Sequence, residues 1–326
     1  MTLPRNIPKA LARIALHRLG GLQALAWYRR GFFQILTYHR FDEVAGLDHV
    51  AALRRQCAYI RKNFHPVSMS QVARALRGDG RLPPNAVVIT VDDGYHDILT
   101  IAAPVFREYQ LPATVYLITG FLDGRLWPWW DRVEYAVKHT AKPAVDEGLA
   151  TEKPLPLHTD AERRAAYVEL CAALVKLPNR SRLEIMEQLP RALAVNLPGV
   201  PPPEYAPMTW DDVRGLQKAG FEFGAHTDTH PILPNLEDER AQQYEVAQSK
   251  RRIEEELQNP VLHFCYPNGD FNAATVSAVK QAGFQTATTV LSGYDSLSTD
   301  PLLLKRRMVD PDLAEYYFRE RLSGLH

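Results

Sequence analysis

Short apolar runs that alternate with helix-like segments restrict the fold of this chain more than any other feature of its sequence. The predicted strands are Phe32–Tyr38, Ala86–Val91, Thr114–Ile118, Phe221–Ala225, Val261–Tyr266, Gln285–Val290 and Leu302–Val309. The predicted helices between them are Val50–Asn63, Ser70–Leu76, His96–Tyr109, Trp210–Ala219, Glu239–Leu257 and Ala273–Ala282. This alternation is typical of βαβ units and a parallel sheet. About seven repeats predict an α/β fold, a distorted (β/α)7-type barrel rather than an open sheet.

The alternation breaks down between about residues 121 and 207. Trp127, Trp129 and Trp130 open this stretch, a helical pattern covers most of residues 160–195, and a Pro-rich segment ends it. We interpret it as a mostly helical insertion into a barrel formed by residues 32–326. It is either a wall or lid that faces the site or a purely structural helical hairpin.

The first 31 residues form a separate, basic segment. Up to residue 41 the chain has seven Lys or Arg and no acidic residue, and Leu11, Ile14, Ala15 and Leu19 recur at helical spacing. The pattern predicts an amphipathic helix that either lies on an anionic membrane surface or packs on the barrel with a solvated basic face. No apolar run reaches the roughly 18 residues of a membrane-spanning helix.

Charge, cysteines and the start of the chain bear on partners and compartment. The 38 basic and 38 acidic residues cancel, which argues against a nucleic-acid partner. Three widely separated cysteines do not suggest a disulfide framework. The N-terminus lacks the layout of a secretory signal. We therefore expect a cytoplasmic protein, with peripheral contact to the inner membrane face as an option that the basic segment leaves open.

Two adjacent carboxylates, Asp92 and Asp93, follow the predicted strand Ala86–Val91. At the end of a buried strand they repel each other and are costly unless a cation or a catalytic task compensates. The alternative is a turn in which Asp93 and Gly94 bend the chain and one Asp caps the next helix. Taken alone, the pair leaves both interpretations open.

His226 and His230 directly follow another predicted strand. Imidazoles four residues apart fall on one face of a helical turn, about 5–6 Å apart at Cβ, and can share a metal ion. Alone, this spacing fits chance or capping equally well. Combined with a carboxylate, the two histidines form a ligand set that leaves positions open for water, as hydrolytic metal sites require.

Two further candidates also follow predicted strands. In the segment that begins at Cys265, Pro267 fixes φ and Gly269 permits unusual backbone geometry, so the amides of this rigid loop can point into a site. His39 ends the first strand, where an isolated histidine is more often structural. All four clusters nevertheless lie at the carboxyl ends of strands, where parallel barrels form their active sites.

These motifs resemble those of the polysaccharide deacetylase family, the NodB-homology domain. Thr90-Val91-Asp92-Asp93-Gly94 resembles the T-F-D-D-G motif, and His226-Thr227-Asp228-Thr229-His230 resembles H-[ST]-x-x-H. Phe264–Gly269 resembles the F-x-Y-P-x-G form of the third motif. The resemblance extends from Ile35 to Asp310, apart from the insertion.

The resemblance implies a role for each motif residue. Asp92 would be the general base. Asp93, His226 and His230 would bind Zn2+ or another divalent transition metal. The backbone amide of Asn268 would help to bind the oxyanion.

The chain departs from the common family pattern at two positions. Cys265 stands where many members have an Arg that tethers the catalytic Asp, and Arg306 resembles the Arg that supplies this role in the Y-P-x-G branch, with Arg307 as the alternative. The C-terminal L-x-H motif that often carries the general acid is missing. The branch that this chain resembles takes that histidine from the first strand, which implies His39.

The implied activity is metal-dependent removal of N-acetyl groups from an amino-sugar-containing polysaccharide, oligosaccharide or lipid-linked glycan precursor. Two alternatives stay open. The same site could hydrolyse O-acetyl groups or non-carbohydrate amides, or the barrel could be a catalytically silent glycan-binding module. The tryptophans at the start of the insertion either stack on sugar rings or anchor the insertion.

Overall fold

The computed structural model describes residues 31–41 and 48–323 of the 326-residue chain. The predicted amphipathic helix over residues 1–31 lies outside this part except for its last residue, so it stays a prediction. In the described part, no helix is both long enough and apolar enough to cross a bilayer.

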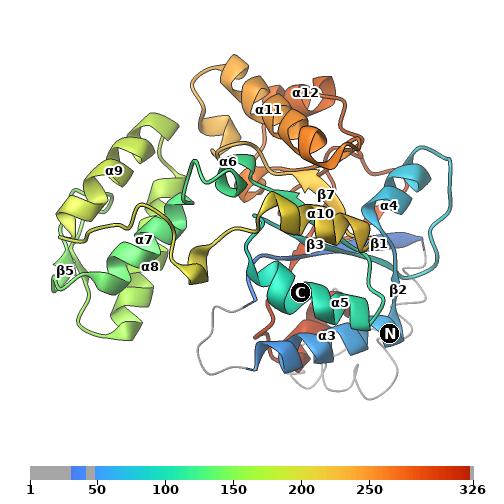
Figure 1. Ribbon diagram of the computed structural model, residues 1–326, viewed down its shortest axis with the longest axis horizontal. Coiled ribbons are helices and arrows are strands. Elements are labelled where there is room, and N and C mark those ends of the chain that lie inside the picture. The colour runs from blue at the N-terminus through green and yellow to red at the C-terminus, as the bar shows by residue number, and fades with distance from the viewer. Residues whose placement is uncertain (1–30, 42–47, 324–326) are drawn as a thin grey trace, which may run out of the picture.

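Parallel strands form a sheet that curls into a distorted barrel (Figure 1). They lie side by side in the order β1 (Phe32–Tyr38), β3 (Ala86–Val91), β4 (Ala113–Leu117), β7 (Glu222–Ala225), β8 (His263–Cys265) and β9 (Thr286–Thr288). The following segment bridges to β9 through Leu304 and to β1 through β11 (Arg307–Met308). It therefore closes the ring, and the predicted (β/α)7-type barrel is confirmed.

Two short strands lie beside this ring. β10 (Asp295–Ser296) pairs antiparallel with the start of β1, and β2 (His65–Pro66) pairs with β3.

Helices cover the outside of the sheet (Figure 1). They are α3 (His49–Asn63), α4 (Met69–Leu76), α5 (Ala103–Glu108), α10 (Trp210–Lys218), α11 (Glu239–Leu257), α12 (Ala273–Gln281) and α13 (Glu315–Ser323). The helix predicted over His96–Tyr109 instead begins with a π-helical turn, η1 (Ile98–Ala102). Pro104 follows that turn and has no N–H to continue an α-helical ladder, which explains the wider turn before it.

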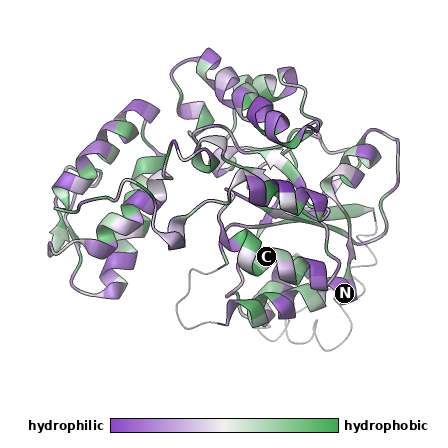
Figure 2. Ribbon diagram, viewed as in Figure 1, coloured by the Kyte–Doolittle hydropathy of each residue, from purple (hydrophilic) through white to green (hydrophobic). Residues whose placement is uncertain are grey.

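Both faces of the central strands are buried, with alternate residues in different cores. Leu36 and Ile89 pack in the main core between the sheet and the helices. Ile35 and Val88 belong to a second core with residues of α4. Because side chains alternate along a strand, burial of both faces requires the nearly continuous apolar runs seen in the sequence. Figure 2 shows the corresponding hydrophobic colour on the strands, with polar residues on the outer helices.

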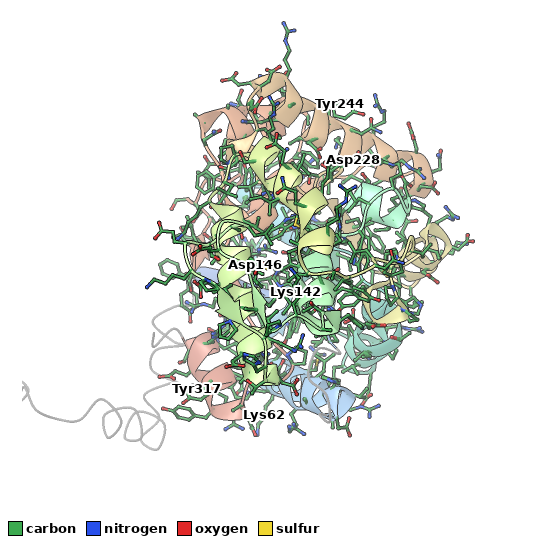
Figure 3. All side chains as sticks on the ribbon, turned by 90° about the vertical axis from the view of Figure 1, so that its left-hand side faces the viewer. Lys62, Lys142, Asp146, Asp228, Tyr244 and Tyr317 are labelled. Carbon is green, nitrogen blue, oxygen red and sulfur yellow. The ribbon has the colours of Figure 1, made fainter. Side chains whose placement is uncertain are left out.

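The insertion forms a unit with its own core beside the barrel. It consists of α7 (Trp129–His139), α8 (Asp160–Val175) and α9 (Asn179–Ala192), with a small hairpin of β5 (Ala144–Val145) and β6 (Leu155–Pro156). The helical pattern predicted over residues 160–195 is divided at Pro178, the N-cap of α9. Figure 3, viewed from the side of the insertion, shows its helices in front of the barrel, with Lys142 and Asp146 labelled in the segment between α7 and β6.

A buried carboxyl group in β10 makes the stability of the fold depend on pH. Asp295 is fully buried, and the Lys305 N–H donates a hydrogen bond of 2.9 Å to its Oδ2. Burial raises the pKa of Asp295 to about 6. The folded chain therefore binds this proton more tightly than the unfolded chain, and the carboxyl group costs stability as the pH rises from about 4 to above 6.

An Asp295→Asn variant is expected to be more stable than the wild type at pH 7.5, because it removes the buried charge and keeps the acceptor. The gain in the free energy of unfolding should be about 1–2 kcal/mol at pH 7.5 and close to zero at pH 4. Urea denaturation at the two pH values measures it. An equal effect at both pH values would contradict the assignment of the raised pKa to Asp295.

Candidate active site

Asp93, His226 and His230 meet at the carboxyl ends of β3 and β7. The Nε2 atoms of the two histidines lie 3.2 Å apart. Asp93 Oδ1 lies 3.6 Å from His226 Nε2 and 3.9 Å from His230 Nε2. All three side chains are buried. The structure thus brings together the three predicted metal ligands, here called the triad.

The backbone that joins the two histidines differs from the predicted helical turn. Residues 226–230 form a loop in which Thr227 (φ 66°) and His230 (φ 54°) both adopt the left-handed conformation. Such backbone is unfavourable for residues with a β-carbon and persists where the surroundings impose it. Within the loop, the His230 N–H donates to Thr227 Oγ1 at 3.0 Å.

Glu245 of α11 supports this loop from behind. Its Oε2 accepts hydrogen bonds from the Asp228 and Thr229 N–H groups, both at 2.9 Å, and its Oε1 accepts one from the Thr229 hydroxyl at 2.6 Å. Glu245 was not predicted as a site residue, because nothing in the local sequence marks a residue of α11 as a support for a loop that ends before the helix begins.

The opposite side of the loop is held by the Asp228 carboxylate. It accepts hydrogen bonds from the Thr119 hydroxyl at 2.5 Å and from the Arg125 guanidinium at 2.5 and 3.1 Å. Both partners lie just after β4. The loop is therefore held both by α11 and by the segment that follows β4.

The protonation states in the triad suit metal binding. The His226 Nδ1 lies 2.8 Å from the Cys265 carbonyl oxygen, so Nδ1 carries the proton and the Nε2 lone pair faces the triad. Burial lowers the pKa of His226 to about 4 and that of His230 well below its usual range. Both imidazoles are therefore neutral at pH 7, as ligation requires.

Asp93, the third member of the triad, has a perturbed pKa. Burial and the nearby carboxylates of Asp92 and Asp131 raise the pKa of Asp93 well above its usual range. A bound cation would reverse this shift by stabilising the ionised carboxylate. The donor atoms of the triad lie within 4.8 Å of one another, and two neutral imidazoles with one carboxylate are ligands that Zn2+ accepts. The triad therefore fits a divalent metal ion.

Asp92 lies beside the triad in a buried ion pair. Arg306 Nη1 donates to Asp92 Oδ1 at 2.7 Å, and its Nε donates to the Thr289 carbonyl at 2.9 Å. Arg307 donates instead to the Arg321 carbonyl. Burial alone would raise the pKa of Asp92, but the charge of Arg306, with His39 and His226, outweighs burial and holds this pKa well below its usual range.

Cys265 occupies the space beside this ion pair. Its sulfur lies 3.0 Å from Arg306 Nη2 and 3.5 Å from Asp92 Oδ2. The thiol therefore stands where the resemblance led us to expect an arginine, while the guanidinium arrives from the segment that closes the barrel.

His39 lies on the open side of Asp92. Its Nε2 is 3.5 Å from Asp92 Oδ2, and its side chain is 35% exposed, whereas that of Asp92 is 1% exposed. Burial lowers the pKa of His39, and the Asp92 charge partly opposes the shift. A group placed between the buried carboxylate and solvent can transfer a proton to a molecule that enters the site.

Asn268 lies in a tight turn, η4 (Pro267–Gly269), at the carboxyl end of β8. Its φ of 56° is left-handed, and its side-chain amide donates to Asp270 at 2.6 Å. Gly269 is required here, because a Cβ at that position would lie 2.4 Å from a methyl group of Val290. The turn is therefore rigid, and the role of the Asn268 amide toward an oxyanion stays a prediction.

The insertion supplies one wall of the site through Trp130. The Trp130 ring packs edge-on against the His230 ring with centroids 4.5 Å apart. Its Nε1 donates to the Tyr95 hydroxyl at 2.8 Å, and Tyr95 donates in turn to the buried Asp131 carboxylate at 2.8 Å. Trp130 was among the residues singled out in the sequence, whereas Tyr95 and Asp131 were not, because they belong to this wall only through tertiary contacts.

Removal of the Glu245 carboxylate is expected to weaken metal binding without touching a ligand. A Glu245→Ala variant leaves the Asp228 and Thr229 N–H groups without their acceptor. Loss of such a support typically lowers metal affinity by about 10–100-fold. Glu245→Gln keeps an acceptor and should lose less. Competition with a chromophoric chelator measures both variants, and wild-type affinity in Glu245→Ala would contradict this role.

The fold and the site together define a class of protein, a parallel barrel with two histidines and one carboxylate clustered at the carboxyl end of its strands. A family profile described as polysaccharide deacetylase matches residues 79–152 and 200–287. The unmatched residues between them fall within the insertion. Over these residues the chain matches the polysaccharide deacetylase family.

Curated relatives and solved structures agree with this assignment. The poly-beta-1,6-N-acetyl-D-glucosamine N-deacetylase of Escherichia coli (strain K12) is 36% identical over 102 residues, which make up 30% of this chain and only 15% of that relative. The deacetylase PplD of Streptococcus pyogenes, solved in complex with acetate, has a TM-score of 0.59 at 17% identity and covers 90% of this chain and 97% of its own. IcaB from Ammonifex degensii has a TM-score of 0.57 at 16% identity, with 90% and 96% covered. At these identities the structural likeness shows a shared fold.

Proposed function

We propose that this protein is a metal-dependent deacetylase that hydrolyses N-acetyl groups of an amino-sugar-containing glycan. The observation that carries the proposal is the buried Asp92–Arg306 ion pair beside the Asp93, His226 and His230 triad. It combines an ionised base with a ligand set for a Lewis-acidic metal, as amide hydrolysis requires. The matched region of the Escherichia coli relative supports poly-β-1,6-N-acetylglucosamine or a similar glycan as the substrate.

Each residue of the site has a defined task in the proposed reaction. A divalent ion held by the triad would polarise the acetyl carbonyl and make water more acidic. Asp92, kept ionised by Arg306, accepts a proton from the water that attacks the carbonyl carbon. The Asn268 N–H donates to the oxyanion that forms.

The amine leaves only with a proton, since an amide anion is a very poor leaving group. His39, on the open side of Asp92, donates this proton to the nitrogen as the C–N bond breaks, and the products are acetate and a free amine. The Asp92 carboxylate, 3.5 Å from His39 Nε2, stabilises the protonated imidazole that this transfer requires.

The form of the substrate and its location in the cell are also part of the proposal. A lipid-linked precursor of a surface polysaccharide, presented at the cytoplasmic face of the inner membrane, is consistent with the basic segment at residues 1–31. The seven Lys or Arg before residue 42 would favour an anionic membrane surface.

Acetate release tests the proposal directly. Protein loaded with Zn2+ is incubated with β-1,6-linked N-acetylglucosamine oligomers, and acetate and free amines are quantified in the same samples. We expect equal amounts of both, each dependent on the metal. Release of acetate without amines from an O-acetylated control glycan would indicate ester hydrolysis instead. Binding of the oligomers without any turnover would favour a catalytically silent glycan-binding barrel.

A further inference from the structure

A small polar pocket lies next to His39, between the barrel and the insertion. Its volume is about 190 Å3, and its lining includes Arg40 and Phe41, which directly follow His39 in the chain. The barrel also contributes His49 from α3 and the pair Asp310 and Asp312. Asp310 is close enough for its charge to act on His39. The pocket therefore adjoins the candidate active site.

The insertion also lines this pocket, through Arg164. It lies on α8, and its neighbour Arg163 fastens that helix to the end of α7 by donating to the Thr140 carbonyl at 3.1 Å. Arg40 is already engaged, since it donates to the Glu204 carbonyl at 2.7 Å. The Arg164 side chain is exposed, and within residues 31–41 and 48–323 no hydrogen bond or ion pair holds it.

The chemistry of the lining favours a neutral sugar over an ion. The lining combines the exposed Arg164 guanidinium, a donor, with two carboxylate acceptors, Asp310 and Asp312. A phosphate would meet repulsion from the acids, whereas sugar hydroxyls donate to carboxylates and accept from guanidinium groups. The volume is below the roughly 300–1,000 Å3 of sites for drug-sized ligands, which suits a single sugar ring.

We propose that this pocket is a subsite for the sugar unit next to the one that is deacetylated, and that Arg164 of the insertion is its specificity-determining residue. The inference rests on the proposed function and deepens it. The preferred substrate is a glycan of at least two units that spans the barrel and the insertion, and a single N-acetylated sugar leaves the pocket empty.

Chain-length dependence tests the subsite. The kcat/KM for acetate release is measured with β-1,6-linked N-acetylglucosamine monomer and tetramer, for wild type, Arg164→Ala and Lys176→Ala. Lys176 is an exposed cation at the far end of α8 and serves as the matched control. Loss of a hydrogen bond to a charged group should lower the tetramer value of Arg164→Ala by about 10–100-fold. The monomer value should fall far less, and Lys176→Ala should match the wild type.

Two results would contradict the proposed subsite. One is a loss in Arg164→Ala that is equal for monomer and tetramer, and the other is no loss at all. If the wild type releases acetate from neither substrate, the proposed function is wrong. Calorimetric titration of the tetramer then tests the subsite by binding, independently of turnover. Weaker binding by Arg164→Ala than by Lys176→Ala supports it, while equal binding or no binding overturns it.

Discussion

Substitution of His226 by alanine is expected to remove the bound divalent ion and to reduce acetate release by at least about 10³-fold, because both the carbonyl polarisation and the acidified water depend on that ion. His226 Nε2 lies within 3.6 Å of both His230 Nε2 and Asp93 Oδ1, so its loss leaves only two of the three candidate ligands. Metal content is measured by mass spectrometry after exposure to zinc and removal of excess ion.

The matched control is His158→Ala, which removes an exposed histidine of the insertion. It should retain about one ion per chain, like the wild type, because a zinc site of this kind holds a single ion. Circular dichroism establishes that both variants are folded. Full metal occupancy in folded His226→Ala would refute the triad as the metal site.

Substitution of Arg306 by methionine is expected to cost both stability and activity. Arg306 and Asp92 are almost completely buried, and removal of one partner from a buried ion pair typically costs about 3–5 kcal/mol, since the other charge is left unpaired. The pKa of Asp92 would rise without its counter-charge, so the base would be protonated over a wider pH range. Acetate release should fall by about 100-fold or more.

A double-mutant cycle separates the two effects. Asp92→Asn alone leaves Arg306 as a buried unpaired cation and should also be destabilised. The double variant Asp92→Asn, Arg306→Met removes both charges, so its loss of unfolding free energy should be smaller than the sum of the single losses by about 2 kcal/mol or more. Its acetate release should stay absent, because the base is gone.

Arg307→Met is the matched control for this cycle. Its side chain donates to the Arg321 carbonyl and lies over the Tyr294 ring, away from Asp92. We expect acetate release close to that of the wild type. A larger loss of activity in Arg307→Met than in Arg306→Met would overturn the assignment of the tethering arginine, and simple additivity in the cycle would show that the two charges do not interact.

Local sequence patterns were sufficient to predict most of the barrel. The strands Phe32–Tyr38 and Ala86–Val91 and the helix Glu239–Leu257 have the predicted bounds to the residue. Each is long, with a continuous apolar run or a clear N-cap, such as Asp238, whose side chain accepts from the Arg240 N–H. The division of the insertion at Pro178 and the π-helical turn before Pro104 were missed, although a proline lies at each.

The candidate site was predictable only where its residues form short motifs. Asp92, Asp93, His226 and His230 stand in two local clusters at strand ends, and parallel strands bring such ends together. Glu245 and Asp131 carry no such signal, because their roles depend on contacts with loops from other elements. The choice between Arg306 and Arg307 likewise depends on which side chain turns inward, and adjacent residues of an extended segment point to opposite sides.

The segment from Leu304 to β11 has a consequence for how this protein becomes active. The same few residues that join β9 to β1 also carry Arg306, 214 positions along the chain from Asp92. A contact between residues so far apart in the sequence forms slowly, because closing the long loop costs conformational entropy before any favourable contact forms. Local opening of this seam would separate Asp92, the proposed base, from its counter-charge. Catalytic competence and closure of the ring are therefore gained and lost as one cooperative unit, and turnover reports on the integrity of the last barrel seam.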